Sequence, residues 1–75
     1  MGKLRVLSGE AVCAILRGHG FAEVRRRGSH IVMQKMTPDG TITVPVPDRA
    51  EVRIGTLQSI IRQSGLPRRL FEVEL

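Results

Sequence analysis

The stretch HIVMQKMTPDGTITVPV, residues 30–46, decides the fold of this chain. Two runs rich in β-branched residues flank the tripeptide Pro38-Asp39-Gly40, and this combination is typical of a tight turn between antiparallel strands. We therefore predict strands over residues 30–35 and 41–46. Because Pro45 has no backbone N–H to donate, the second of these strands is expected at an edge of the sheet.

A further strand is predicted just upstream, over residues 21–27. Phe21 and Val24 favour extended backbone, and Gly28-Ser29 is a pair of turn-forming residues that can reverse the chain. Three sequential strands then form a meander whose central strand is 30–35.

Two helices are predicted on either side of this meander. Over residues 8–19, Ser8 supplies an N-cap, and apolar side chains recur at helical spacing. His19 continues this apolar stripe, and we interpret it as a structural residue. The same spacing recurs over residues 54–64, and Gly65 supplies a left-handed end.

The order helix, three strands, helix predicts an α+β fold. Two amphipathic helices can cover one face of a three-stranded antiparallel sheet, which gives a two-layer α-β-β-β-α domain. At 75 residues the chain has room for one small domain. We assign this domain to residues 1–75, with a core at about 7–66 and a tail at 67–75. The tail carries only a weak signal, for either a helical turn or an extended segment.

Composition restricts the classes of partner. A net charge of +5 on so short a chain favours a polyanion, such as nucleic acid or an acidic protein. Cys13 is the single cysteine and lies in an apolar helical stretch, so we interpret it as a core residue and expect neither a disulfide nor a zinc site. No apolar run approaches the length of a membrane span, and we expect a cytoplasmic protein. With no Trp or Tyr, the chain lacks an aromatic platform for stacking bases.

The strongest functional signal is the stretch RRRGSH, residues 25–30. It brings guanidinium groups, a turn with exposed backbone N–H groups and an imidazole within a few residues of one another. Such groups can hold a phosphodiester and move a proton on it. We therefore predict a phosphate-binding set formed by Arg25, Arg26, Arg27, Gly28 and Ser29. Because side chains alternate along a strand, Arg25 and Arg27 share one face and Arg26 takes the other.

Two further predictions concern this chemistry. His30 is the candidate catalytic residue, although composition alone would also allow an ordinary strand histidine. Gly55 and Thr56 open the second helix, and their free N–H groups form a candidate phosphate site. Capping and tight packing would explain Gly55 and Thr56 equally well.

A resemblance to the HicA family of bacterial toxins is carried by an ordered set of short motifs, namely Gly28-Ser29-His30, Val44-Pro45, Gly55-Thr56-Leu57, Ile60-Ile61 and Gly65-Leu66. The resemblance runs over about residues 7–66. It implies a fold similar to a double-stranded RNA-binding domain and the activity of a small ribonuclease that cleaves mRNA. It also implies a partner, a HicB-like antitoxin that binds the toxin and blocks its active site.

The family's Gly-Ser-His motif falls on residues 28–30, so the resemblance implies that His30 is the catalytic histidine. Many relatives carry a second histidine directly after this motif, where this chain has Ile31, and another after the Val-Pro-Val segment, where it has Pro47. We predict a metal-independent endoribonuclease without a cofactor, the toxin of a type II toxin–antitoxin pair. In this mechanism neutral His30 takes the proton of a ribose 2′-hydroxyl. The sequence does not identify the general acid.

Two other interpretations stay open. The first is a non-catalytic RNA-binding module of the same fold, and the second is a protein-interaction subunit whose basic face binds an acidic partner. A double-stranded RNA binder would carry a lysine cluster at the start of its second helix, where this chain has only Arg53 and, further on, Arg62. The sequence leaves the RNA sequence preference open. It also leaves the oligomeric state open, and a monomer is one of the possible states.

Overall fold

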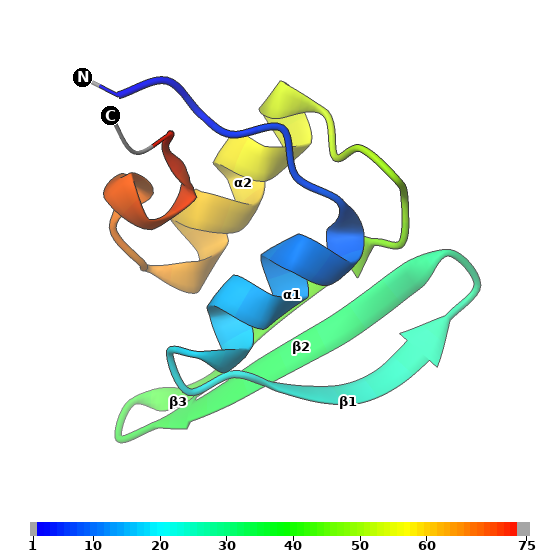
Figure 1. Ribbon diagram of the computed structural model, residues 1–75. Helices are drawn as coiled ribbons and strands as arrows, with labels where there is room; N and C mark the ends of the chain where they lie inside the picture. The colour runs from blue at the N-terminus through cyan, green and yellow to red at the C-terminus, as the bar shows by residue number, and fades with distance from the viewer. Residues whose placement is uncertain (1, 74–75) are drawn as a thin grey trace.

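Three antiparallel strands and two α-helices make up most of the computed structural model, which describes residues 2–73 (Figure 1). In chain order the elements are α1 (Gly9–Arg17), β1 (Ala22–Arg27), β2 (His30–Thr37), β3 (Gly40–Pro47), α2 (Ile54–Ser64) and the 3₁₀ helix η1 (Arg68–Phe71). The predicted α-β-β-β-α order is therefore confirmed. Residues 1 and 74–75 of the domain predicted from the sequence lie outside the described residues.

The sheet has the strand order β1-β2-β3, which confirms the central position of β2 and the edge position of β3. A two-residue turn joins β2 to β3 and leaves Thr37 opposite Gly40. That register continues without interruption, so His30 lies opposite Pro47 at the other end of the two strands. The prolines of β3 lack backbone donors, which protects this edge from pairing with another strand.

Both helices pack on the same face of the sheet (Figure 1). Side chains of β2 and β3 that point to this face meet side chains of α1 and α2 in one hydrophobic core. Its fully or almost fully buried members include Val12, Leu16, Ile31, Met33, Val44, Val46, Leu57 and Ile60. Among residues 2–73, no helix is both long enough and apolar enough to cross a membrane.

The first helix is shorter than predicted, because α-helical hydrogen bonding ends at Gly18 and a bond between residues three apart follows it. Gly18 is the C-cap, and the His19 N–H donates to the carbonyl of Leu16 at 3.0 Å, three residues back. Gly20 then leaves the helix with a φ of 95°. His19 consequently lies beyond α1 and is exposed, so the interpretation of His19 as part of the buried stripe is wrong.

The two terminal segments pair with each other. Leu4 and Glu72 form an isolated antiparallel bridge, and the Arg5 N–H donates to the carbonyl of Phe71 at 2.8 Å. The tail thus contains both predicted features, a helical turn in η1 and an extended segment after it. Phe71 is fully buried, so η1 closes one end of the core.

Burial of Cys13 makes the stability of the protein sensitive to alkaline pH. Cys13 has no exposed surface, and burial together with the Glu10 carboxylate raises the pKa of its thiol from 9.0 to about 11. Above pH 9.0 the unfolded chain therefore releases this proton before the folded chain does, which favours unfolding. We expect the free energy of unfolding to fall with rising pH, by on the order of 2 kcal/mol at pH 11 relative to a Cys13→Ala variant. Urea unfolding of both proteins at several pH values checks this, and parallel pH curves for the two would contradict it.

Candidate functional site

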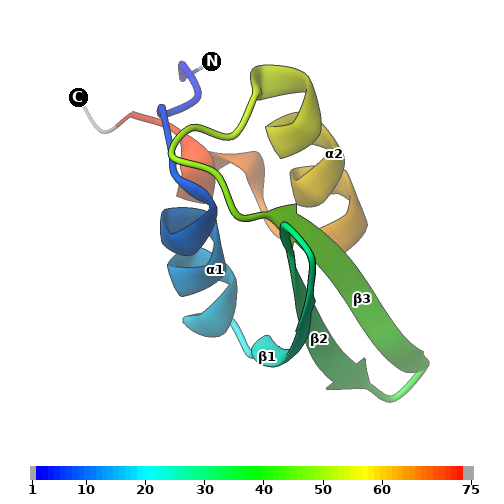
Figure 2. The ribbon, with the colours of Figure 1, turned by 90° about the vertical axis from the view of Figure 1, so that its right-hand side faces the viewer.

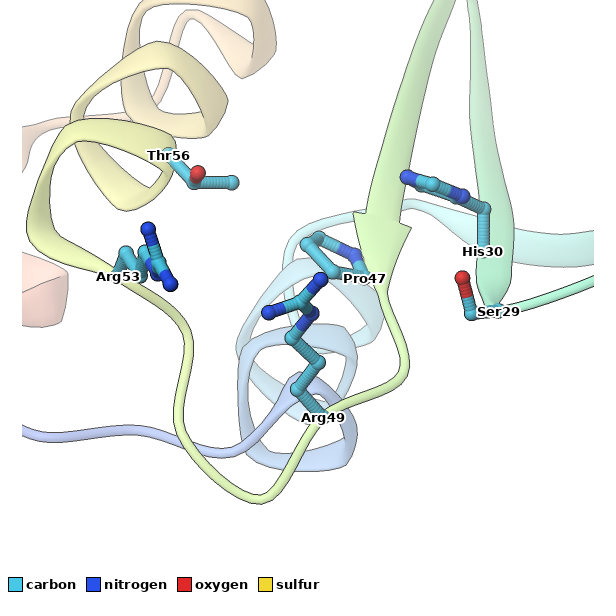
Figure 3. A pocket seen from close by; sticks show the side chains of 6 residues that line it. All are labelled: Ser29, His30, Pro47, Arg49, Arg53 and Thr56. Atoms are coloured by element: carbon cyan, nitrogen blue, oxygen red, sulfur yellow. The ribbon is translucent and has the colours of Figure 1, made fainter.

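A cavity of about 350 Å³ lies where the start of β2, the end of β3 and the first turn of α2 come together. Six residues line it: Ser29, His30, Pro47, Arg49, Arg53 and Thr56. Figure 3 shows Ser29 and His30 on one side of the opening and Arg53 and Thr56 on the other, with Pro47 and Arg49 between them. Three of the site residues predicted from the sequence therefore line the same cavity, namely Ser29, His30 and Thr56.

The position of His30 is set by the turn that precedes it. Gly28 and Ser29 form the two-residue loop between β1 and β2, and Gly28 has a φ of 57°. A positive φ at the first loop position is the pattern of a type II′ hairpin turn, which suits glycine. His30 is thus the first residue of β2, paired with Arg27 on one side and Pro47 on the other. Its side chain is exposed and points away from the face that carries Ile31.

The segment that follows β3 is held in place by backbone hydrogen bonds from two directions. The Asp48 N–H donates to the carbonyl of Ser29 at 2.6 Å, and the Gly9 N–H donates to the carbonyl of Arg49 at 2.8 Å. Figure 2 shows this segment passing beside the start of α1 before it reaches α2. Both bonds fix the backbone that carries Arg49 relative to the turn that carries His30.

The approach of α1 to this segment requires a glycine. A Cβ on Gly9 would overlap the carbonyl oxygen of Pro47 and would stand 3.2 Å from the backbone nitrogen of Arg49. Gly9 is buried, so the neighbouring backbone has no free space into which to withdraw. No local sequence pattern indicates this constraint.

Arg49 and Arg53 line the cavity, but the site predicted from the sequence does not include them. Arg49 lies between the predicted third strand and the predicted second helix, and Arg53 directly precedes that helix. Both side chains are exposed and line the cavity opposite or beside the imidazole of His30 (Figure 3). The signal that points to them is the register of the β2–β3 hairpin, because it brings the end of β3 to the start of β2.

Arg26 belongs to an ion-pair network and does not line the cavity. Its guanidinium lies 2.9 Å from Glu10, 3.0 Å from Glu23 and 3.3 Å from Asp48, so it ties α1 and β1 to the segment after β3. The hydrogen bond from Arg26 lowers the pKa of the Glu23 carboxyl. Pairing with Glu23 and Glu10 in turn raises the pKa of Arg26, which keeps its charge fixed.

Arg25 and Arg27 lie on the opposite face of β1. Arg25 pairs with Val32 and Arg27 with His30, whereas Arg26 pairs with the core residue Ile31. The prediction that Arg25 and Arg27 share a face is therefore confirmed. The β-bulge at Val24 precedes all three arginines and so does not change their alternation. Neither Arg25 nor Arg27 has an ion-pair partner among residues 2–73.

The two helix N-termini differ in how their free N–H groups are used. At α1, the Ser8 hydroxyl accepts a hydrogen bond from the Ala11 N–H at 3.0 Å, and Glu10 supplies a negative charge. At α2, no side chain caps the N-terminus and the first turn holds no acidic residue. A Cβ on Gly55 would meet nothing within 4 Å. Tight packing therefore does not account for Gly55, and the first turn of α2 is open to an anion.

Among residues 2–73, no group of three or more His, Cys, Asp and Glu side chains is arranged to hold a metal ion. The polar groups gathered at the cavity are instead one imidazole, two guanidinium groups, two hydroxyl groups and backbone N–H groups. These groups can bind a phosphate and accept a proton.

Comparison with known proteins decides the family. The family model of the HicA toxin of bacterial toxin–antitoxin systems matches residues 9–66 of the 75-residue chain. The chain belongs to the HicA toxin family. No curated protein matches it. The region shared with the HicA toxins begins at Gly9 and ends just after α2, so it contains every residue that lines the cavity.

We predict that Gly9→Ala destabilises this HicA-family protein by about 1–3 kcal/mol, because the added Cβ forces α1 and the segment after β3 apart. Gly18→Ala is a matched control: its φ is −65° and its Cβ would make only an ordinary contact, 3.5 Å from the carbonyl oxygen of Ile15. Urea or thermal unfolding measures both variants. Equal stabilities for the two would contradict the constraint at Gly9.

Proposed function

We propose that this HicA-family toxin is an endoribonuclease that cleaves mRNA with His30 as its catalytic base. The observation that carries the proposal is the single cavity in which His30 faces Arg49, Arg53 and the open first turn of α2. A base beside several anion-binding groups suits a reaction in which negative charge develops on a phosphate. Membership of the HicA family supports the same conclusion.

In the proposed reaction, His30 removes the proton from a ribose 2′-hydroxyl. The 2′-oxygen then forms a bond to the adjacent phosphorus, and the bond between phosphorus and the 5′-oxygen breaks. The cavity lining contains one imidazole and no carboxyl group, so we assign protonation of the leaving 5′-oxygen to a water molecule, which can reach the exposed His30. The hydroxide that this water leaves takes the proton from the His30 imidazolium, which returns the imidazole to its neutral form. The products are a 2′,3′-cyclic phosphate and a 5′-hydroxyl end, and no step uses a metal ion.

The phosphate that gains charge is held by donors from both sides of the cavity. Arg49 and Arg53 provide guanidinium groups that can each donate two hydrogen bonds to phosphate oxygens. The backbone N–H groups of Gly55 and Thr56 face the site from the positive end of the α2 dipole. Backbone N–H groups of the Gly28-Ser29 turn complete the proposed set.

The proposed biological partner is a HicB-like antitoxin that covers the cavity and prevents RNA from entering. We place this regulation in the cytoplasm, where mRNA is translated. Covering this opening would remove His30, Arg49 and Arg53 from solvent at the same time, because all three are exposed and line one cavity.

Substitution of His30 tests the mechanism, and His19 provides the matched control because it is an exposed histidine outside the cavity. We expect His30→Ala to lower the rate of RNA cleavage by roughly 10²–10⁴-fold, the contribution of a general base. His19→Ala should cleave as the unaltered protein does. Cleavage of a purified mRNA is followed with and without EDTA, and the new ends are analysed for cyclic phosphate.

Three outcomes would contradict the proposal. Equal cleavage by His30→Ala and His19→Ala would remove His30 from the chemistry. Complete loss of cleavage in EDTA would require a divalent ion. Absence of both RNA cleavage and growth arrest for the unaltered protein, with RNA binding intact, would favour a non-catalytic RNA-binding module.

Arg49→Gln and Arg53→Gln test the phosphate-binding side of the cavity. Each should lower the cleavage rate about tenfold or more, because one charged donor to the developing negative charge is lost. Arg62→Gln removes the same charge from the last turn of α2, outside the cavity, and should leave the rate unchanged. If all three variants cleave equally, the two arginines contribute only to net charge.

A further inference from the structure

The face of the sheet opposite the helices is a second continuous surface that reaches His30. Strand register places alternate residues of β1, β2 and β3 on it, and none of them belongs to the hydrophobic core cluster. We call this surface the outer sheet face, and its residues are Ala22, Arg25, Arg27, His30, Val32, Gln34, Met36, Thr41, Thr43, Pro45 and Pro47. The cavity described above lies at one end of it, because His30 and Pro47 belong to both.

Within residues 2–73 the two sides of β1 differ in charge, with unpaired positive charge on the outer side and the carboxylates on the core side. Arg25 and Arg27 bring two exposed positive charges to the outer sheet face, and no acidic residue shares that face within residues 2–73. The carboxylates nearest in the fold, Glu10, Glu23 and Asp48, are gathered on the core side around Arg26. The outer sheet face therefore presents uncompensated positive charge beside the proposed catalytic base.

We propose that the outer sheet face binds single-stranded RNA next to the cleaved bond, with Arg27 and Arg25 contacting successive phosphates on one flank. The proposal rests on the proposed function, since it takes His30 as the point of cleavage. The two arginines are two residues apart on one strand, so their backbones are separated by about 7 Å. They can accordingly follow an extended phosphodiester chain as it leaves the cavity.

The rest of the surface suits nucleotides of an unpaired strand. Val32 and Pro45 lie opposite each other at its centre; Val32 is buried, so Pro45 supplies the exposed apolar surface. Beyond them the Gln34 side-chain amide donates to the Thr43 hydroxyl at 3.2 Å, and this exposed polar pair can exchange hydrogen bonds with a base edge. Phe21 and Phe71 are both buried in the core, so neither phenyl ring is available for bases to stack on. Phosphate contacts must then supply most of the affinity, and binding should depend strongly on salt.

The experiment uses His30→Ala as background, so that RNA is bound but not cleaved. Binding of a short, fluorescently labelled single-stranded RNA is measured by anisotropy over a range of salt concentrations. Arg25→Gln/Arg27→Gln in this background should lower the affinity roughly tenfold and reduce the salt slope by about 1.4, the value for two lost phosphate contacts. Arg5→Gln/Arg69→Gln is the matched control, because it removes two exposed charges from the N-terminal segment and η1. These two segments pair with each other and lie away from the sheet (Figure 1).

The outcomes separate this inference from the proposed function. If both double variants lose the same affinity and salt slope, the outer sheet face is not an RNA-binding surface. Unchanged RNA binding with lost binding to an acidic protein partner would also overturn the inference and assign the face to that partner. If the unaltered protein does not cleave RNA while binding still depends on Arg25 and Arg27, the proposed function fails, and with it the placement beside a cleaved bond, whereas the assignment of the outer sheet face as an RNA-binding surface stands. Circular dichroism and thermal unfolding of each variant confirm that it is folded.

Discussion

The contact between the start of α1 and the end of β3 is the constraint on which the rest of the structure depends. Gly9 donates its N–H to the carbonyl of Arg49, and only the absence of a side chain lets the two backbones come this close. A second hydrogen bond holds the same short segment, because the Asp48 N–H donates to the carbonyl of Ser29. The amphipathic helix α1 is thereby docked on the sheet, and the backbone that carries His30 and Arg49 is fixed at the same time. Fixed backbone of this kind is what an active site needs if its donors are to stay in place during a reaction.

Three consecutive arginines serve different purposes because a strand alternates its side chains. Arg26 points to the core side, where three carboxylates surround it. Exposed ion pairs of this kind contribute little free energy each, but this set joins α1, β1 and the segment that carries Arg49. It also neutralises the three carboxylates on the core side of β1, and none of them lies on the face that carries Arg25 and Arg27.

The sequence predicts the elements of this fold better than it predicts the site. The Pro38-Asp39-Gly40 turn and the two β-branched runs locate β2 and β3, and helical spacing locates α2 with both bounds correct, at Ile54 and Ser64. The end of α1 was misplaced, because apolar spacing continues through His19 although Gly18 and Gly20 end the helix. Arg49 and Arg53 were missed for another reason. Their nearness to His30 follows from pairing across the hairpin, and a local pattern does not reveal it. Only the register, with Thr37 opposite Gly40 and hence His30 opposite Pro47, shows which loop reaches the base.

The contrast between the two helix N-termini explains why the site lies where it does. The N-terminus of α1 is used by the fold, since Ser8 caps it and Gly9 bonds to the segment after β3. The N-terminus of α2 has no cap, no acidic residue and a glycine that neither φ nor packing requires. A glycine in a helix costs roughly 0.5–1 kcal/mol relative to alanine, and uncapped N–H groups forgo about 1 kcal/mol of stabilisation. Both costs fall on the one helix end that faces the cavity, and a bound phosphate would offset them. A side-chain cap therefore stabilises the N-terminus of α1, whereas the N-terminus of α2 has no such cap and keeps the free N–H groups that the proposed chemistry needs.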